Sequence, residues 1–208
     1  MSRQAAQKLG RRATYADLEA VPRGKVAELI DGQLYVFPRP APRHLNAESG
    51  LTRAIRGPFQ DDEDGPGGSW IIQEPEVHFP EPAEPDGVQV VDPDLAGWRV
   101  ERMPELPETA YFPLPPDWIC EVLSPSTEDY DRETKTPLYA ANGVPWAWLV
   151  DPIARTLEVY VLGKDRRWKE PTIHRGDARV RAVPFDAIEL NLAQLWAPAP
   201  KGGPRKAR

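Results

Sequence analysis

The sequence is poor in cysteine, with Cys120 alone among its 208 residues. A single cysteine cannot form an internal disulfide, and a chain without disulfides is typical of the reducing cytosol. No apolar run approaches the roughly 20 residues that a membrane-spanning helix needs. The N-terminal segment MSRQAAQKLGRR lacks the apolar stretch of a signal peptide. We therefore expect a cytoplasmic protein with no membrane segment.

Motifs of two common enzyme classes are also missing. No glycine-rich phosphate-binding loop is present, so nothing in the sequence predicts a nucleotide cofactor. Ser124 lies outside a G-x-S-x-G frame, which argues against a serine hydrolase. Cys120 falls within an apolar run and is better explained as a small core thiol than as a nucleophile.

Positive charge is scarce as well, since 26 Lys and Arg residues face 32 Asp and Glu residues, for a formal net charge of −6. This balance argues mildly against a protein that coats nucleic acid. It is compatible with a nuclease whose carboxylates hold metal ions. Basic residues gather at the two ends of the chain, and we interpret residues 1–13 and 199–208 as basic tails around a single domain at 14–198.

Proline is abundant, and its 25 residues cluster in segments such as FPEPAEPDG and MPELPETAYFPLPP, which predict loops. Between these loops the sequence carries both helical and strand patterns. Helices are predicted at 14–22, 44–56 and 126–143, and strands at 25–37, 69–79, 87–98, 117–123 and 144–162. This order predicts an α/β (α+β) domain built around one mixed β-sheet that is flanked by helices.

Turn and cap residues refine these elements. Asp31-Gly32 between two apolar runs predicts a tight hairpin. Pro137 predicts that the helix at 126–143 breaks and restarts, with Thr136 as a second N-cap. The segment 178–196 predicts a last strand and a short terminal helix.

Four carboxylates, those of Glu28, Asp92, Asp94 and Glu121, fall at the ends or in the middle of predicted strands. The most unusual is Glu121 in the apolar run WICEV, because a buried carboxylate is costly unless a cation or hydrogen-bond donors compensate it. If the strands of Asp94 and Glu121 are neighbours, both carboxylates can reach one Mg²⁺. In that case they lie within about 4–6 Å, and their repulsion raises at least one pKa. The alternative, that each acid is an ordinary solvent-exposed group at a strand end, stays open.

A second set of possible ligands lies on the predicted helix 44–56. His44 and Glu48 are four residues apart, which places them on one helical face as a possible metal-binding pair. No third ligand is apparent beside them in the sequence. A histidine at a helix start is also commonly a cap or packing residue, so both interpretations of His44 stay open.

Four segments occur along the chain in the order AELIDGQLYVFPRPAPRH, DPDLAGW, WICEVLSPST and DRETKTPLYAANGVPWAWLVDP. Together they resemble the Uma-two family, described as putative restriction endonucleases, within the PD-(D/E)XK nuclease superfamily. The resemblance runs from about residue 14 to residue 196. It implies a restriction-endonuclease-like core, DNA as the substrate, hydrolysis of phosphodiester bonds, and Mg²⁺ or Mn²⁺ as the cofactor.

The resemblance also implies roles for single residues. Asp94 and Glu121 are expected to bind the metal ion, and Glu28 to add a ligand directly or through water. The superfamily carries a lysine two residues after the second acid, where this sequence has Leu123. The family supplies its lysine from the following helix, which matches Lys135 and implies that Lys135 assists the attacking water.

Two hypotheses of different classes follow. The first is an active metal-dependent endonuclease, in which His44 contacts phosphate or transfers a proton. The second is a catalytically silent relative that binds nucleic acid or protein. The missing strand lysine and the acidic surface favour the second hypothesis, and the retention of every other acid favours the first. A solvated Lys135 paired with Asp131 would point to the second hypothesis. An enzyme that cuts both strands needs two sites, so we expect a homodimer, with the hairpin 146–162 as a candidate interface unless it belongs to the core.

Overall fold

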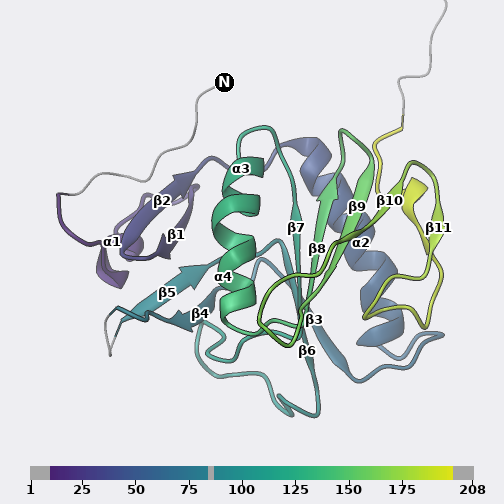
Figure 1. Cartoon of the computed structure of the whole chain (residues 1–208), viewed down its shortest axis with the longest axis horizontal. Coiled ribbons are helices and arrows are strands. Elements are labelled where there is room, and N and C mark those ends of the chain that lie inside the picture. The colour runs from purple at the N-terminus through teal and green to yellow at the C-terminus, as the bar shows by residue number, and fades with distance from the viewer. Residues whose placement is uncertain (1–9, 84–86, 199–208) are drawn as a thin grey trace, which may run out of the picture.

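Two β-sheets carry the fold, where the sequence predicted one, and they lie side by side (Figure 1). A computed structural model describes residues 10–83 and 87–198, so the predicted tails lie outside it at 1–9 and 199–208. The smaller sheet contains β2 (Gln33–Phe37), β1 (Val26–Ile30), β5 (Val88–Val91) and β4 (Val77–Pro80), in this spatial order. The larger contains β10 (Thr172–Arg175), β9 (Thr156–Val161), β8 (Trp146–Asp151), β7 (Trp118–Val122), β6 (Leu95–Arg99) and β3 (Ser69–Gln73). The fold class, mixed sheet flanked by helices, is as predicted.

The extra sheet arises because two predicted strands divide. The strand predicted at 69–79 separates into β3 and β4 at Glu74-Pro75, where Glu74 has a positive φ of 44°. The strand predicted at 87–98 separates into β5 and β6 at Asp92-Pro93-Asp94. Proline has no N–H to give to a sheet, so it interrupts the ladder at both places. The second break leaves Asp92 and Asp94 at the junction of the two sheets.

Both predicted hairpins are present. Asp31 and Gly32 have φ of 52° and 69°, the left-handed conformations that a tight hairpin turn requires, and they join β1 to β2. The hairpin 146–162 forms β8 and β9, which lie between β7 and β10 in the larger sheet. Its side chains Trp148, Val150 and Leu157 are buried in the core. This hairpin is therefore core rather than a free interface, and the homodimer stays a prediction.

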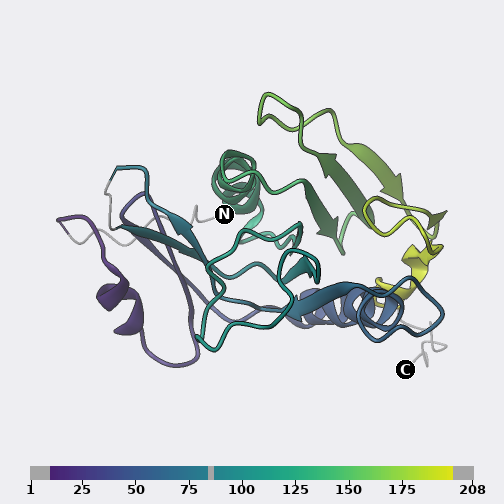
Figure 2. The same ribbon diagram turned by 90° about the horizontal axis from the view of Figure 1, so that it is seen from below.

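Helices cover both faces of the larger sheet (Figure 2). The helix α2 (Pro42–Phe59) buries Leu51 and Ile55 against Trp118, Cys120 and Val122 on one face. A second helical segment, 128–141, packs on the other face, where β7 presents Ile119 and Glu121 by the alternation of side chains along a strand. The alternation thus turns Glu121 toward this second helical segment.

The helical segment 128–141 does not break at Pro137, so that prediction was wrong. It runs through α3 (Glu128–Tyr130), a π-helical turn η1 (Asp131–Lys135) and α4 (Thr136–Ala141). Thr136 has helical dihedrals and donates its hydroxyl hydrogen to the Asp131 carbonyl at 2.7 Å, instead of capping a new helix. The wider π-turn accommodates a proline that cannot donate to the carbonyl four residues back. Asp131 and Lys135, at the two ends of this turn, are both buried.

At the start of the described chain the predicted cap is present, and at its end the predicted terminal helix is not. At the start, α1 (Tyr15–Glu19) has the expected cap, since the Thr14 N–H donates to Asp17 at 2.8 Å. Contacts begin before it, because the Ala13 N–H donates to the Gly32 carbonyl at 2.7 Å. At the end, the segment 178–196 forms the short pair β11 (Arg179–Val180) and β12 (Leu190–Asn191) and the 3-10 turn η2 (Leu192–Gln194), not an α-helix. Within the described ranges, every helix is too short or too polar to cross a bilayer.

Candidate active site

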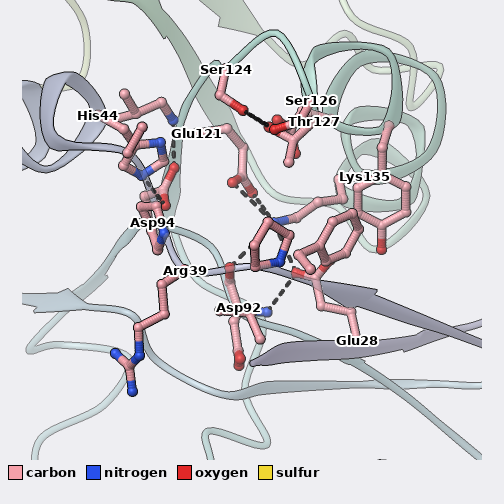
Figure 3. Close-up of a pocket in the computed structure, with 18 of the residues that line it drawn as sticks. Glu28, Arg39, His44, Asp92, Asp94, Glu121, Ser124, Ser126, Thr127 and Lys135 are labelled. Atoms are coloured by element: carbon pink, nitrogen blue, oxygen red, sulfur yellow. Dashed lines mark hydrogen bonds and ion pairs between the residues drawn. The ribbon is translucent and has the colours of Figure 1, made fainter. Parts of the chain in front are cut away.

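A cavity of about 530 Å³ opens where the two sheets meet α2 and the helical segment 128–141. All five residues predicted for the site line it: Glu28, His44, Asp94, Glu121 and Lys135 (Figure 3). They come from both sheets and both helical segments. The fold therefore gathers at one place side chains that are up to 107 residues apart, from Glu28 to Lys135 (135 − 28).

Glu121 is the buried carboxylate whose compensation the sequence left open. It is only 2% exposed, and two groups reach it from the helical segment 128–141. The Tyr139 hydroxyl donates to Oε1 at 2.5 Å, and Lys135 Nζ lies 2.9 Å from Oε1 and 3.0 Å from Oε2. Burial raises the pKa of Glu121 to about 7 against the opposing charge of Lys135, and Asp94 raises it further. The Lys135 ammonium and the Tyr139 phenol thus compensate the cost of burying the Glu121 carboxylate in a strand.

Lys135 is the centre of an ion-pair network, and it is only 4% exposed. Besides Glu121, its Nζ lies 2.9 Å from Glu28 Oε1 and donates to the Asp92 carbonyl at 3.2 Å. Burial acts to lower the pKa of Lys135, but the Glu121 and Glu28 carboxylates raise it well above its ordinary value. The ammonium is therefore protonated. The alternative of a solvated lysine paired with Asp131 is wrong.

Glu28 ties the smaller sheet into this network. Its Oε1 forms an ion pair with the Lys135 ammonium and accepts a hydrogen bond from the Asp92 N–H at 2.9 Å. Burial and the neighbouring charge of Glu28 raise the pKa of Asp92 to about 7. Glu28 and Asp92 thus bring negative charge from the smaller sheet up to an ammonium that also contacts the larger one.

A second cluster lies on the α2 side of the cavity. His44 Nε2 lies 2.8 Å from Asp94 Oδ1, and Asp94 Oδ2 accepts the Val122 N–H at 2.6 Å. Glu48 Oε1 accepts a hydrogen bond from the Gln73 side chain at 2.9 Å. His44, Glu48 and Asp94 each offer one ligand atom, and these three atoms lie within 4.8 Å of one another. Asp94 is the third ligand that the sequence did not reveal for the pair on the helix.

Electrostatics in this second cluster follow from its burial. Burial is the largest single effect and acts to lower the pKa of His44, but the hydrogen bond to Asp94 and the negative charges of Asp94 and Glu48 together outweigh it, so the pKa is raised. Burial raises the pKa of Glu48. The Asp94 side chain is 15% exposed, so it is reachable from the cavity. A divalent cation in place of the proton between His44 and Asp94 would add positive charge. It would thereby lower the raised pKa of both His44 and Glu48.

The donor set of this cluster fits a divalent metal ion. Two carboxylates suit Mg²⁺ and Mn²⁺, and an imidazole adds preference for a transition metal. His44, Glu48 and Asp94 are therefore candidate ligands for the ion that the resemblance implied. The strands of Asp94 and Glu121 are neighbours as expected, and extending the register from Leu95↔Cys120 sets Asp94 opposite Glu121. Sharing of one ion by these two acids stays a prediction.

Three residues of the site were missed or set aside by sequence reasoning: Glu48, Tyr139 and Asp131. Glu48 lacked a visible third ligand, which only the β5–β6 break supplies. Tyr139 was not among the predicted site residues, yet its hydroxyl donates a hydrogen bond to Glu121. Asp131 was considered only as a surface partner of Lys135, yet it is buried and lines the cavity. The spacing Asp131, Lys135, Tyr139, four residues each, was the available signal of one inward face.

Known proteins similar to this chain are described as nucleases. A family model described as "Uma2: Putative restriction endonuclease" matches residues 12–193. The crystal structure of "a putative nuclease belonging to DUF820" from Anabaena variabilis aligns with a TM-score of 0.67 and 23% sequence identity, covering 88% of this chain and 97% of that one, so the two share a fold. No curated protein matches the chain. Because the family model spans most of its length, the chain belongs to the Uma2 family.

Proposed function

We propose that the protein is a divalent-metal-dependent DNA endonuclease that hydrolyses phosphodiester bonds. The observation that carries the proposal is the position of Lys135, whose ammonium lies 2.9 Å from Glu121 and supplies the cation that Leu123 cannot. Membership of a family described as restriction endonucleases, and a fold shared with a protein described as a nuclease, support this reaction class.

Asp94 is the proposed central ligand, and Mg²⁺ or Mn²⁺ the proposed cofactor. His44 and Glu48 flank Asp94 on one side, and Glu121 stands opposite it on β7. Bound there, the ion would acidify a water molecule and neutralise charge on the phosphate. Glu28 was predicted as a further ligand, but its Oε1 contacts the Lys135 ammonium and accepts the Asp92 N–H in this structure. We therefore propose that Glu28 mainly holds Lys135 in place.

The proposed role of Lys135 is electrostatic. A protonated ammonium cannot accept a proton from water, so Lys135 is not the general base. It can orient the attacking water and stabilise the negative charge that develops on the phosphate oxygens. Tyr139 and Glu28 position this charge by holding Glu121 and the ammonium in place.

The alternative of a catalytically silent binding module rested on the missing strand lysine and on the acidic surface. The position of Lys135 bears on the first of these. That argument weakens once a lysine from the helix is found among the acids. The homodimer remains a separate prediction, which applies if the protein cuts both strands of a duplex, because that needs two sites. Light scattering at micromolar concentration measures this directly, and a monomer would contradict it.

A plasmid-nicking assay tests the proposed activity. Supercoiled plasmid is incubated with the protein in EDTA, Mg²⁺ or Mn²⁺, and we expect nicking only with a metal ion. Asp94→Asn should abolish it, whereas Asp129→Asn, an equal charge change at an exposed position on the same helical segment as Lys135, should not. Absence of cleavage of both plasmid and single-stranded DNA in either ion, or an unchanged Asp94→Asn variant, would overturn the proposal.

A further inference from the structure

The cavity is small relative to a DNA duplex. Its volume of about 530 Å³ falls within the range of roughly 300–1,000 Å³ that encloses one small molecule. Double-stranded DNA is far larger, since its major groove alone is about 12 Å wide. The volume of the cavity suits one nucleotide better than a base-paired segment.

The groups proposed for catalysis lie on the floor of this cavity. Glu28 and Glu121 are each 2% exposed, and only the Asp94 side chain is appreciably open. Two loops that line the cavity, 38–41 and 124–127, contain several exposed residues and form its rim. A DNA duplex is stiff, with a persistence length of about 150 base pairs. One of its phosphates therefore cannot move past the rim to the cavity floor while its neighbours stay in the helix. A strand without its complement has that freedom.

The walls suit a base and a sugar. Phe37 and Tyr130 line the cavity, and their rings pack together with centroids 4.9 Å apart. Tyr130 is 9% exposed, and its buried hydroxyl lies near the Glu28 carboxylate but makes no hydrogen bond of good geometry among the described residues. An unpartnered buried hydroxyl is costly, and a polar atom of a bound nucleotide would relieve that cost. This aromatic wall is the feature that proteins use to hold an unstacked base.

Two free cations stand at the cavity. Lys25 and Arg39 line it and are exposed, and neither makes an ion pair or side-chain hydrogen bond within residues 10–83 and 87–198. The Arg39 guanidinium points away from Glu121 and Lys135 (Figure 3). It is therefore placed for a phosphate next to the one that is cut. The net charge of −6 disfavours extended binding of a duplex through its phosphates.

We infer that the substrate is unpaired DNA, which inserts one nucleotide into the cavity while Arg39 and Lys25 hold the adjoining phosphate. This inference rests on the proposed nuclease function. Enzymes that enclose a nucleotide in a pocket act on single strands or extrude the nucleotide from the duplex. A free end, a gap or a flap would therefore be cut in its unpaired part.

Strand state is tested with one labelled oligonucleotide in three forms: single-stranded, fully duplex, and as a flap on a duplex. With Mn²⁺ and excess protein, we expect the single strand and the flap to be cut at least about tenfold faster than the duplex, as for a barrier difference of 1.4 kcal/mol. Equal rates, or faster cleavage of the duplex, would overturn the inference and leave the nuclease proposal intact.

Fluorescence anisotropy in EDTA separates binding from cleavage. Single-stranded DNA should bind at least about tenfold tighter than duplex. Arg39→Ala should remove most of that preference, whereas Lys164→Ala, a loss of equal charge outside the cavity, should have no effect. Preferential binding without any cleavage would support this inference and overturn the nuclease proposal. Equal binding of the two forms would overturn the inference.

Discussion

The ammonium of Lys135 lies 2.9 Å from the Glu121 carboxylate, although one residue is on a helical segment and the other on a strand. The superfamily motif places both groups on one strand, and this chain has Leu123 at that position. Leu123 is itself buried. In this chain the cation that contacts the Glu121 carboxylate comes instead from the helical segment 128–141.

Substitution of Lys135 should affect both stability and cleavage. Lys135→Ala leaves Glu28 and Glu121 buried without their cation, so we expect the free energy of unfolding to fall by about 3–5 kcal/mol. Urea denaturation measures this fall. Cleavage should fall by orders of magnitude, and Lys135→Arg should restore it only in part, because a guanidinium does not fit the contacts of an ammonium.

A double variant keeps this prediction decisive if Lys135→Ala does not fold. Lys135→Met with Glu121→Gln removes both charges, and it should be more stable than Lys135→Ala. If Lys135→Ala unfolds at the same urea concentration as wild type, the ammonium does not compensate these acids.

Tyr139→Phe should weaken the support of Glu121. The change removes a 2.5 Å hydrogen bond between two buried groups, at an expected cost of about 1–3 kcal/mol in the free energy of unfolding. Tyr160→Phe is the matched control, because the Tyr160 hydroxyl binds Glu158 at 2.8 Å in a half-exposed place. Urea denaturation at pH 8 should separate the two variants, and equal losses would contradict the special role of Tyr139.

Stability should fall as the pH rises from about 5 to 7. The pKa of Asp92 is about 7 in the folded protein, against an ordinary value of 3.8. A carboxyl with a raised folded-state pKa stabilises the fold at low pH, and this contribution is lost as the pH passes through that value. Glu121, also raised to about 7, acts in the same direction.

Asp92→Asn tests this pH dependence. At pH 8, in EDTA, the variant should be more stable than wild type by about 2 kcal/mol, and its urea midpoint should vary less between pH 5 and 8. Asp129→Asn, at an exposed position, should follow the wild-type curve. A wild-type midpoint that rises steadily from pH 5 to 7 would show that the sign is wrong.

Metal-binding variants should identify the ligands. If Asp94, His44 and Glu48 hold the ion, then Glu48→Gln should weaken Mn²⁺ binding by roughly 10–100-fold, whereas His174→Asn should not. His44→Asn should weaken Mn²⁺ more than Mg²⁺, because imidazole prefers the transition metal. Calorimetric titration of protein without DNA measures each constant. Loss of binding in Glu121→Gln but not in Glu48→Gln would move the ion to the β7 side.

Local rules predicted the elements of the fold well and their partners less well. Asp31-Gly32 predicts its turn because few residues accept a positive φ, and this property is independent of the rest of the chain. Pro75 and Pro93 mark breaks, but nothing local says that β4 and β5 leave the larger sheet. Pro137 predicted a break that packing overrides, since Leu138 and Tyr139 are buried against both sheets.

The site shows the same division. Glu121 was recognisable because a carboxylate in an apolar strand needs compensation, and Lys135 was identified through its family resemblance. The approach of Glu48 to Asp94 was not predictable, because it depends on how α2 packs across the sheet junction. The hydroxyl of Tyr139 was hidden for a similar reason, since aromatic side chains on a buried helical face are usually only packing residues.

The connection Asp92-Pro93-Asp94 serves both sheets at once. The Asp92 backbone binds Glu28 and Lys135, and the Asp94 side chain binds His44 and the Val122 N–H. One added or deleted residue here would shift β6 by one position against β7, and Leu95 would turn from the α2 face to the opposite face. The length of this connection is therefore fixed, and natural or engineered insertions should be confined to loops such as 100–116, which lie outside the cavity.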